Sequence, residues 1–367
     1  NIGRGFVGLI LHRAGYRLTF VDVNVALIDA INAAESYTVR EVGEHPAEQR
    51  VTGFDAINSA SDPDAAVAAV ASADIVTCAV GPNAMRFIAP VIRAGLQLRD
   101  APAPLTVMAV ENAIGASDTL RDLVAADGGD TALDRAVFAN TAVDRIVPGQ
   151  DDSGIDVVVE DFFEWAIDRA PFAGAEPSIP DAHFVDDLQP YIERKLFTVN
   201  TGHATTAYFG YRAGVETIAE ALAVPEIRQA VEGALAETSR LVVAKFGVDP
   251  DGHALYVARA LQRFENPALP DTCVRIGRQP LRKLGREDRF VRPAAALAEA
   301  GESTPALVAA YRAALDFDAA DDEQAIELQE NLRELSAEAF VTHVSGIEDG
   351  HPLFDALVAA VRDRQAG

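Results

Sequence analysis

The sequence predicts an α/β protein in two parts, an N-terminal part of alternating strands and helices and a mostly α-helical C-terminal part. Short apolar segments alternate with helical ones through about the first 160 residues, a pattern typical of a sheet covered by helices. From Asp187 onward the pattern is helical almost throughout, and no convincing strand is found. The length of 367 residues suits two domains, each with its own core.

The first segment predicts the start of a Rossmann-type dinucleotide-binding unit. Residues 1–5 lead into an apolar helical segment that runs to about Ala14, and a strand over residues 18–22 follows. A Rossmann unit runs strand, glycine-rich turn, helix, second strand and acidic residue. Gly3 fits the third glycine, which lets the helix pack closely on the sheet. The first strand and first two glycines do not precede it, so we expect a chain truncated by roughly ten residues and less stable than its parent.

Asp22 ends the second strand, where a carboxylate accepts hydrogen bonds from the hydroxyls of the adenosine ribose. A carboxylate at this position also repels a 2′-phosphate, and no arginine follows it directly. The sequence therefore predicts NAD as the cofactor in preference to NADP.

Further strands and helices follow in alternation. Asp62 is expected to cap a helix that has Pro63 at its first position. Beyond it we predict, in order, the end of that helix near residue 73, a strand over 75–80, a helix over 83–96 and a strand over 105–110. The ends of such strands face the ligand crevice. Gly81 and Asn112, which follow the two strands, are therefore candidate cofactor-binding residues, Gly81 through its backbone.

The end of the N-terminal part is less regular. Asn140 lies at the tip of another predicted strand, and residues 157–160 are expected to close the sheet. Residues 171–186 are rich in proline, glycine and short polar side chains, which is typical of a linker. We therefore predict a dinucleotide-binding domain over residues 1–185 and a helical substrate domain over residues 186–367.

One helix of the second domain carries the strongest chemical signal. Asp187 is expected to cap a helix that begins near residue 188 and runs to about residue 213, before Gly214. Lys195, one of only three lysines in the chain, lies in it with Asn200 and His203. At about 100° per residue, Asn200 lies roughly 140° and His203 roughly 80° around the helix from Lys195. Residues 198–202 have low helix propensity, which indicates a site or close packing.

These three residues suit proton transfer without a metal. The seven histidines are scattered and show no metal-ligand spacing. A lysine can act as a base only if its pKa falls from about 10.4 by two to three units, a shift that desolvation in a cleft favours. Arginine, which accounts for the 28 other basic residues, cannot accept a proton near neutral pH.

The order Lys195, Asn200, His203 resembles the K-x4-N-x2-H signature of the polyol-specific long-chain dehydrogenases, the mannitol dehydrogenase family. Three further segments agree with it, at residues 1–6, at 141–148, and at 263–267 with 275–280 after it. The run over residues 193–203 is similar to the branch that acts on a polyol phosphate. The resemblance implies oxidation of D-mannitol 1-phosphate to D-fructose 6-phosphate, and the reverse, with NAD.

The resemblance also implies residue roles. Lys195 would be the general base, Asn200 and Asn140 would donate hydrogen bonds to the developing alkoxide, and His203 would fix a substrate hydroxyl or orient the lysine. Relatives carry Gly-Ala-Gly just before an Asn-Ile-Gly like residues 1–3, so Asn1 and Ile2 join Gly3 as cofactor-binding candidates. Many relatives are monomers, which implies a monomer or weak dimer.

A basic segment suits the phosphate of such a substrate. Residues 275–292 contain seven basic side chains against two acidic ones, within a chain of net charge −25. Guanidinium groups bind phosphate through paired hydrogen bonds. Arg275, Arg278 and Lys283 are the phosphate candidates, with Arg212 a weaker one; pairing of these groups with the acidic body of the protein is the alternative.

Composition excludes several other classes of protein. The net charge of −25 argues against nucleic acid as a partner, and no run of 18 apolar residues predicts a membrane span. Two cysteines without metal or disulfide spacing fit the cytoplasm. Two alternatives stay open: a dehydrogenase of an unphosphorylated polyol or a hexuronate, and a non-catalytic NAD-binding sensor.

Overall fold

The computed structural model describes residues 1–111, 113–126, 130–150, 154–269 and 271–367. It divides into two compact units, Asn1–Ile192 and Glu193–Gly367. Each unit has its own core of buried apolar side chains. The α/β fold class predicted for the first part and the helical class predicted for the second are both confirmed.

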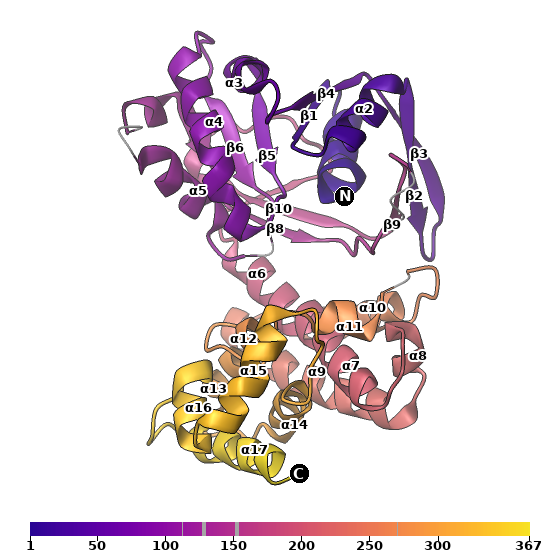
Figure 1. Ribbon diagram of the computed structural model, residues 1–367, viewed down its shortest axis with the longest axis vertical. Helices are drawn as coiled ribbons and strands as arrows, with labels where there is room; N and C mark the ends of the chain where they lie inside the picture. Colours follow the sequence, from indigo (N-terminus) through magenta and orange to yellow (C-terminus); the bar gives the residue numbers. More distant parts are fainter. Residues whose placement is uncertain (112, 127–129, 151–153, 270) are drawn as a thin grey trace. The chain divides into compact units, whose positions relative to one another are not determined.

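The N-terminal unit holds the strands. β5 (Ile75–Cys78), β6 (Leu105–Ala109) and β7 (Ala136–Phe138) form a parallel sheet, and β1 (Leu18–Asp22) pairs in parallel with β4 (Phe54–Asn58). Two more sheets have the strand orders β3-β2-β9 and β11-β10-β8, with bounds Ala47–Thr52, Ser36–Val42, Val157–Glu160, His183–Val185, Glu164–Asp168 and Thr141–Asp144. Helices flank these strands (Figure 1).

The helices of this unit begin where the sequence provides caps and breaks. The π-helix η1 (Gly3–Gly8) and α1 (Leu9–Arg13) come first, and Asp62 caps α3 (Pro63–Ser72) by accepting from the backbone N–H of Ala65 at 3.0 Å. The remaining helices of the unit are α2 (Val25–Ala33), η2 (Pro82–Ala84), α4 (Met85–Leu98), α5 (Ala116–Ala125), η4 (Asp130–Arg135) and η5 (Ala170–Phe172). The predicted strand at residues 18–22 and the helix at Pro63 are confirmed.

The end of the N-terminal sheet was predicted incorrectly. β9 (Val157–Glu160) does not close it, because β10 and β11 follow, and β11 lies inside residues 171–186, which were interpreted as a linker. The hairpin of β2 and β3 was not predicted either, although every second residue of β2, at Tyr37, Val39 and Glu41, is buried. β11 has only three residues beside a proline- and glycine-rich stretch, so its pattern is too short to recognise.

Among its described residues the second unit has helices and loops but no strand, apart from one isolated bridge between Thr217 and Thr272. The first long helix is interrupted: α6 (Gln189–Lys195) passes into the π-helix η6 (Leu196–Asn200) and then into α7 (Thr201–Arg212). The others are α8 (Ile218–Leu222), α9 (Pro225–Phe246), α10 (Pro250–Phe264), α11 (Cys273–Gly277), α12 (Pro280–Lys283), α13 (Val291–Glu299), α14 (Pro305–Ala314), α15 (Glu323–Glu334), α16 (Ala337–Ser345) and α17 (Phe354–Ala366).

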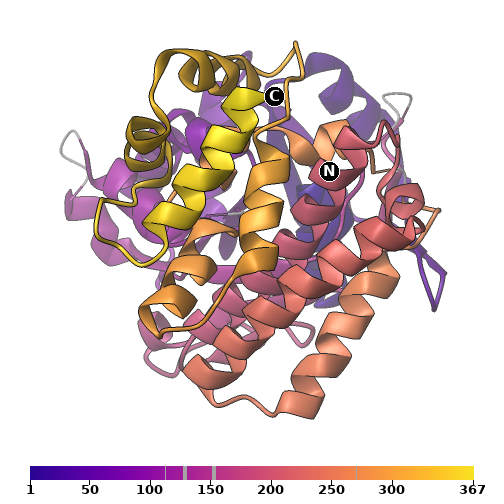
Figure 2. The same ribbon diagram turned by 90° about the horizontal axis from the view of Figure 1, so that it is seen from below.

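The core of this unit surrounds α7. Helices α7, α9 and α14 pack against one another, and Tyr208 of α7 is fully buried between Phe290 and Phe317. In the view of Figure 2, the long helices α9 and α10 run side by side. The helix that carries the candidate chemistry therefore lies in the core of its unit.

Candidate active site

Lys195, Asn200 and His203 lie on one continuous helical segment. Lys195 is the last residue of α6, Asn200 the last of η6, and His203 belongs to the first turn of α7. Lys195, Asn200 and Thr201 all have right-handed helical dihedral angles, so the backbone does not break between the three named elements. The single long helix predicted here is confirmed, but its π-helical turn was not predicted.

The π turn changes how these side chains relate to one another. The backbone N–H of Thr201 donates to the carbonyl of Leu196, five residues earlier. In an α-helix residues five apart lie roughly 140° apart, whereas a turn closed at five residues brings them close to one face. Lys195 and Asn200 are five apart and span this turn. The π turn thus reduces the angular separation that an uninterrupted α-helix would impose on them.

His203 occupies a nearly enclosed position. Its ring stacks on Phe264 with centroids 4.9 Å apart and planes at 9°, and its side chain is 14% exposed. Nε2 lies 3.5 Å from Oδ2 of Asp271, which in turn binds the guanidinium of Arg275. Burial, reinforced by the positive charges of Arg275 and other basic groups, lowers the pKa of His203 to about 3. The imidazole is therefore neutral at neutral pH, able to donate one hydrogen bond and accept another.

Glu193 anchors the same helix two residues before Lys195. Its fully buried carboxylate accepts from Lys245 Nζ at 2.7 Å and from Arg292 at 2.8 Å. These two cations come from α9 and from α13, so the carboxylate ties the end of α6 to both helices. A buried charge needs such partners to offset its desolvation. Lys245 therefore has a structural role.

The third lysine, Lys283, is also held by the fold. It is 5% exposed, and its ammonium donates to the carbonyl of Ile276 at 2.5 Å and to that of Arg278. It also lies 5.8 Å from the centre of the Tyr208 ring. Burial, together with the positive charges of Arg289 and Arg282, holds the pKa of Lys283 well below its usual value. The structure places this phosphate candidate on backbone carbonyls at the end of α11.

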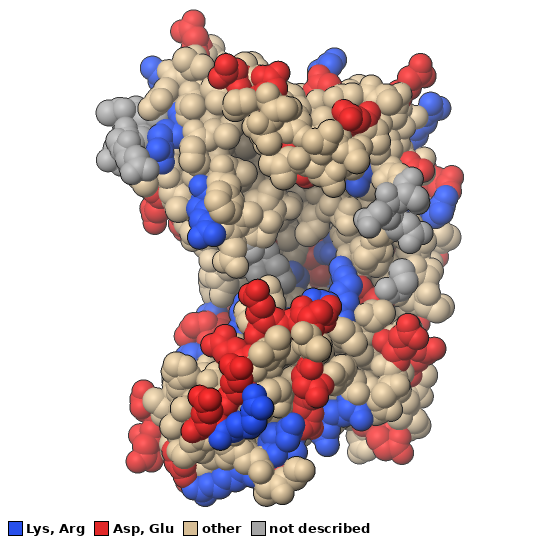
Figure 3. Space-filling model, viewed as in Figure 1, with Lys and Arg blue, Asp and Glu red and all other residues tan. Residues whose placement is uncertain are grey.

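The arginines of the basic segment are paired with acids drawn from several elements. The pairs are Arg275 with Asp271, Arg278 with Asp321, Arg282 and Arg289 with Asp288, Arg286 with Glu299, and Arg292 with Glu193. Arg212 pairs with Asp316. On the visible face of the C-terminal unit, acidic and basic side chains lie next to one another and form no separate basic patch (Figure 3). The local excess of positive charge is thus offset by acids from elsewhere in the chain.

A strained residue separates two of the phosphate candidates. Gln279 has φ of 60°, a left-handed conformation that is rare for a residue other than glycine. Its N–H donates to Asp322 Oδ2 at 2.6 Å, which helps to hold it there. Such strain gathers at functional sites. The guanidinium groups of Arg275 and Arg278, which both precede Gln279, remain 43% and 42% exposed.

In the N-terminal unit, Asp22 ends β1 as predicted. Its Oδ1 accepts from the backbone N–H groups of Val23 at 2.7 Å and Asn24 at 2.9 Å, and the residue is exposed. The turn therefore fixes the carboxylate at the carboxyl end of the strand while leaving it accessible. This placement suits a group that accepts from ribose hydroxyls.

A second strand end presents Gly81. It has φ of 89°, and a Cβ added there would meet no atom within 4 Å, so its backbone can be approached. The buried carboxylate of Glu111, after β6, accepts from the N–H groups of Val80 at 2.7 Å and Gly81 at 2.9 Å. Burial raises the pKa of Glu111, although these two bonds oppose the shift. Asn112, the other candidate at this strand end, lies outside the described residues.

The first residues form the beginning of η1. Asn1 is exposed, and its carbonyl accepts from the N–H of Gly5 at 2.7 Å, while Ile2 is partly buried. The close packing predicted for Gly3 is wrong: no atom lies within 4 Å of a Cβ added there. Gly5 provides that contact, because a Cβ on it would lie 2.6 Å from Cγ1 of Val157 in β9.

Asn140 is held by the start of α5. Its Oδ1 accepts from the N–H groups of Ser117 at 3.0 Å and Asp118 at 3.4 Å, and its Nδ2 donates to Asp118 Oδ2 at 2.6 Å. An amide nitrogen carries two hydrogens, so one N–H remains beyond the bond to Asp118. The start of α5 therefore orients the amide.

The structure thus groups the predicted residues in sets. Lys195, Asn200 and His203 share one helix, and Arg275 joins them through Asp271. Sequence reasoning missed Phe264 and Asp271 as partners of His203, although both lie in or beside segments that carry the family resemblance. Among the described residues no three His, Cys, Asp or Glu side chains converge as metal ligands do. No helix in the described ranges is long and apolar enough to cross a membrane.

Comparison with known proteins gives consistent results. Residues 1–181 match the Mannitol dehydrogenase Rossmann domain, and residues 187–350 match the Mannitol dehydrogenase C-terminal domain. A mannitol-1-phosphate 5-dehydrogenase of Paenarthrobacter aurescens is 55% identical over 371 residues, covering 100% of this chain and 97% of the relative. One of Ajellomyces capsulatus is 49% identical, covering 98% of this chain and 95% of that protein.

Solved structures show the same fold at low identity. The mannitol 2-dehydrogenase of Pseudomonas fluorescens, in a ternary complex with NAD and D-mannitol, has a TM-score of 0.80 at 17% identity, covering 100% of this chain and 89% of that one. A D-sorbitol dehydrogenase has a TM-score of 0.74 at 17% identity, covering 100% and 90%. Taken with the two domain matches and the full-length relatives, these findings establish that the chain belongs to the mannitol dehydrogenase family.

Proposed function

We propose that this chain is an NAD-dependent oxidoreductase that interconverts D-mannitol 1-phosphate and D-fructose 6-phosphate. The observation that carries the proposal is the 55% identity, over the whole chain, to a protein named mannitol-1-phosphate 5-dehydrogenase. The arrangement of Lys195, Asn200 and His203 on one helix also supports the proposal, because these residue types suit proton transfer.

The residues of the N-terminal unit fit the cofactor. When bound, NAD would supply the hydride acceptor for oxidation of the alcohol, and NADH the hydride donor for the reverse reaction. Asp22 is accessible at the end of β1 and would accept from the ribose hydroxyls, and its charge would disfavour the 2′-phosphate of NADP. The open backbone at Gly81 would let the cofactor approach the ends of β5 and β6.

Lys195 would accept the proton of the alcohol as the hydride leaves, and donate it in the reverse reaction. Its place on one continuous helical segment with Asn200 and His203 supports this role. Asn200 and the remaining N–H of Asn140 would donate to the developing alkoxide. His203, being neutral, would fix a substrate hydroxyl without placing a second positive charge beside the lysine.

Arg275 and Arg278 are the strongest phosphate candidates. Their guanidinium groups are partly exposed, and each is paired with a carboxylate that a phosphate dianion would have to displace or share. Lys283 would have to leave two carbonyls to reach the substrate. The pairing of the whole segment also motivates a direct comparison with substrates that lack a phosphate.

Parallel assays test the proposal. Fructose 6-phosphate, fructose and fructuronate are each offered with NADH and with NADPH, and calorimetry measures NADH binding in the same preparation. We expect the highest kcat/KM for fructose 6-phosphate with NADH. A preference for fructose or fructuronate would assign the chain to another activity of the family, and NADH binding without turnover would indicate a sensor.

We further propose that residues 1–185 form the cofactor domain and residues 186–367 the catalytic domain, and that the enzyme acts in the cytoplasm as a monomer or weak dimer. The family resemblance supports these proposals. Sedimentation velocity over a range of concentrations tests the assembly state, and a stable tetramer would contradict it.

A further inference from the structure

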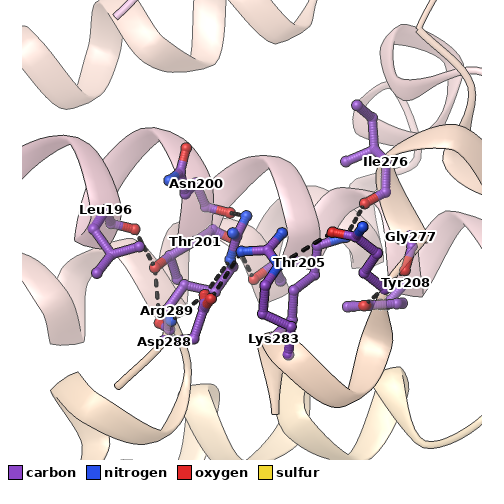
Figure 4. Close-up of polar contacts among 12 residues, drawn as sticks. Leu196, Asn200, Thr201, Thr205, Tyr208, Ile276, Gly277, Lys283, Asp288 and Arg289 are labelled. Carbon is purple, nitrogen blue, oxygen red and sulfur yellow. Dashed lines mark hydrogen bonds and ion pairs between the residues drawn. The ribbon is translucent and has the colours of Figure 1, made fainter. Parts of the chain in front are cut away.

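Three threonines of α7 show a change in hydrogen-bond register at the start of that helix. The hydroxyl of Thr205 donates to the carbonyl of Thr201 at 2.8 Å, and that of Thr206 donates to Gly202 at 2.9 Å. Both bonds reach back four residues, as is usual for a threonine in an α-helix. The hydroxyl of Thr201 instead lies 3.0 Å from the carbonyl of Leu196, five residues back. The register changes at the boundary between η6 and α7 (Figure 4).

Two groups of Thr201 therefore contact the same carbonyl oxygen. Its backbone N–H donates to Leu196 O across the π turn, and its hydroxyl lies within hydrogen-bond distance of that oxygen. Thr201 is fully buried, so water does not offer its hydroxyl an alternative partner. Because a π turn is rare and poorly stabilised on its own, a second donor to the carbonyl that closes it favours the π form over the α form.

Arg289, which is distant in the sequence, also contacts the boundary between η6 and α7. The hydroxyl of Thr201 is also 2.9 Å from the carbonyl of Arg289, and its one proton is shared between the two carbonyls. The guanidinium of Arg289 donates to the carbonyl of Asn200 at 3.3 Å. Figure 4 shows both contacts on the last residue of η6 and the first of α7.

Arg289 is itself held firmly enough to serve this purpose. It is 5% exposed, and its Nε donates to Asp288 Oδ1 at 2.7 Å, while Arg282 binds the other oxygen at 3.0 Å. Burial opposes ionisation of this carboxylate, but Arg289 and Arg282 prevail and keep the pKa of Asp288 below its usual value. A charged, buried pair of this kind has little freedom to move.

We propose that Thr201 is a positioning residue, which holds the π turn through Leu196 and Arg289 and thereby sets Lys195 relative to Asn200 and His203. The proposal rests on the proposed function, in which these three residues carry the chemistry. Without the hydroxyl, the turn would relax toward α-helical register, a slip of one residue or about 100°. Lys195 would then be turned away from the partners that follow it.

Four variants test this inference in the full-length enzyme. Thr201→Val keeps the shape and removes the hydroxyl, and Thr201→Ser restores the hydroxyl. Thr206→Val is the matched control, since Thr206 is also fully buried on α7 and loses one hydroxyl bond outside the π turn. Thr201→Ala provides the same comparison if the valine variant is insoluble. Each is assayed for kcat, for both KM values and for the pH dependence of kcat/KM.

We expect kcat of Thr201→Val to fall by up to about 100-fold, as a misplaced catalytic group does. The KM for NADH should be unchanged, and the basic limb of the pH profile should move because the surroundings of Lys195 change. Thr201→Ser should restore most of the activity, and Thr206→Val should resemble the wild type in kcat while losing similar thermal stability to Thr201→Val.

Two outcomes would contradict the proposal, and they are distinguishable. If Thr201→Val and Thr206→Val lose activity equally, or if neither loses it, Thr201 has no positioning role, although the proposed function stands. If the wild type itself fails to turn over fructose 6-phosphate, fructose or fructuronate, the proposed function fails and this inference fails with it.

Discussion

At the scale of single residues, the charge state of His203 follows from its surroundings. Stacking on Phe264 removes the ring from water, and the carboxylate of Asp271 is engaged by Arg275, so it does not stabilise an imidazolium. The pKa of His203 falls to about 3 as a result. The ring can therefore orient a hydroxyl across the working pH range without changing its charge.

This pKa predicts how stability depends on pH. Between about pH 6.5 and 3, the unfolded chain binds a proton at His203 and the folded chain does not. Stability therefore rises with pH across this window and is lost as the pH falls, by up to about 1.4 kcal/mol per unit for one group. The free energy of unfolding, measured by urea unfolding at several pH values between 7 and 5, should change less with pH for His203→Gln than for the wild type. His45→Gln, at an exposed histidine, is the control, and equal slopes for all three proteins would contradict the assignment.

The phosphate candidates make a prediction about substrate affinity. Arg275→Ala and Arg278→Ala should each raise the KM for fructose 6-phosphate by about 10-fold or more, the loss of one charge-assisted hydrogen bond. NADH affinity should not change. Arg286→Ala removes an arginine of the same segment that pairs with Glu299 and serves as the control. If all three variants keep the wild-type KM, the phosphate binds elsewhere.

At the scale of elements, the contact between η1 and β9 depends on the small size of Gly5. A Cβ there would lie 2.6 Å from Val157 and 2.8 Å from Val159, whereas one on Gly3 meets open space. Gly5→Ala should therefore lower the free energy of unfolding by about 1–3 kcal/mol through overpacking. Gly3→Ala should change it by no more than about 0.5 kcal/mol. Urea unfolding of the two variants measures this, and equal effects would show that the helix does not pack on the sheet at Gly5.

Local signals account for the elements that were predicted correctly. The cap at Asp62, the proline after it and the short apolar strands are decided by neighbouring residues, so the sequence reveals them. The hairpin of β2 and β3 carries charges on its exposed face, and β11 is very short, so both lacked a clear pattern. The π turn was not predictable, because one extra residue leaves the helical pattern intact and part of its support comes from Arg289, 88 residues away from Thr201.

In the candidate site too, features set by nearby residues were predicted and features set by distant residues were not. The spacing of Lys195, Asn200 and His203 indicated one helix, and the structure has one. The basic segment suggested a phosphate site because most of its acidic partners, such as Asp271, Asp321 and Glu299, lie outside it. Charge pairing across elements depends on the folded structure, and the sequence does not reveal it.

At the scale of the whole molecule, the net charge of −25 has a consequence for stability. Excess like charge favours expansion of the chain, and salt weakens this repulsion by shortening the Debye length from about 30 Å at 10 mM to about 8 Å at 150 mM. The melting temperature should therefore rise between these sodium chloride concentrations. A melting temperature that falls would mean that the ion pairs contribute more than the net repulsion costs.

The central claim concerns one amine, and replacing Lys195 tests it most directly. Lys195→Ala removes the base, and Lys195→Arg keeps the positive charge but cannot accept a proton near neutral pH. Lys245→Arg, which keeps a positive charge beside Glu193, is the control for replacement of a lysine in this region. The account predicts that kcat falls by about 10²- to 10⁴-fold in both Lys195 variants while NADH binds normally, and that the control keeps its turnover. Turnover near the wild-type rate in Lys195→Ala would contradict the account.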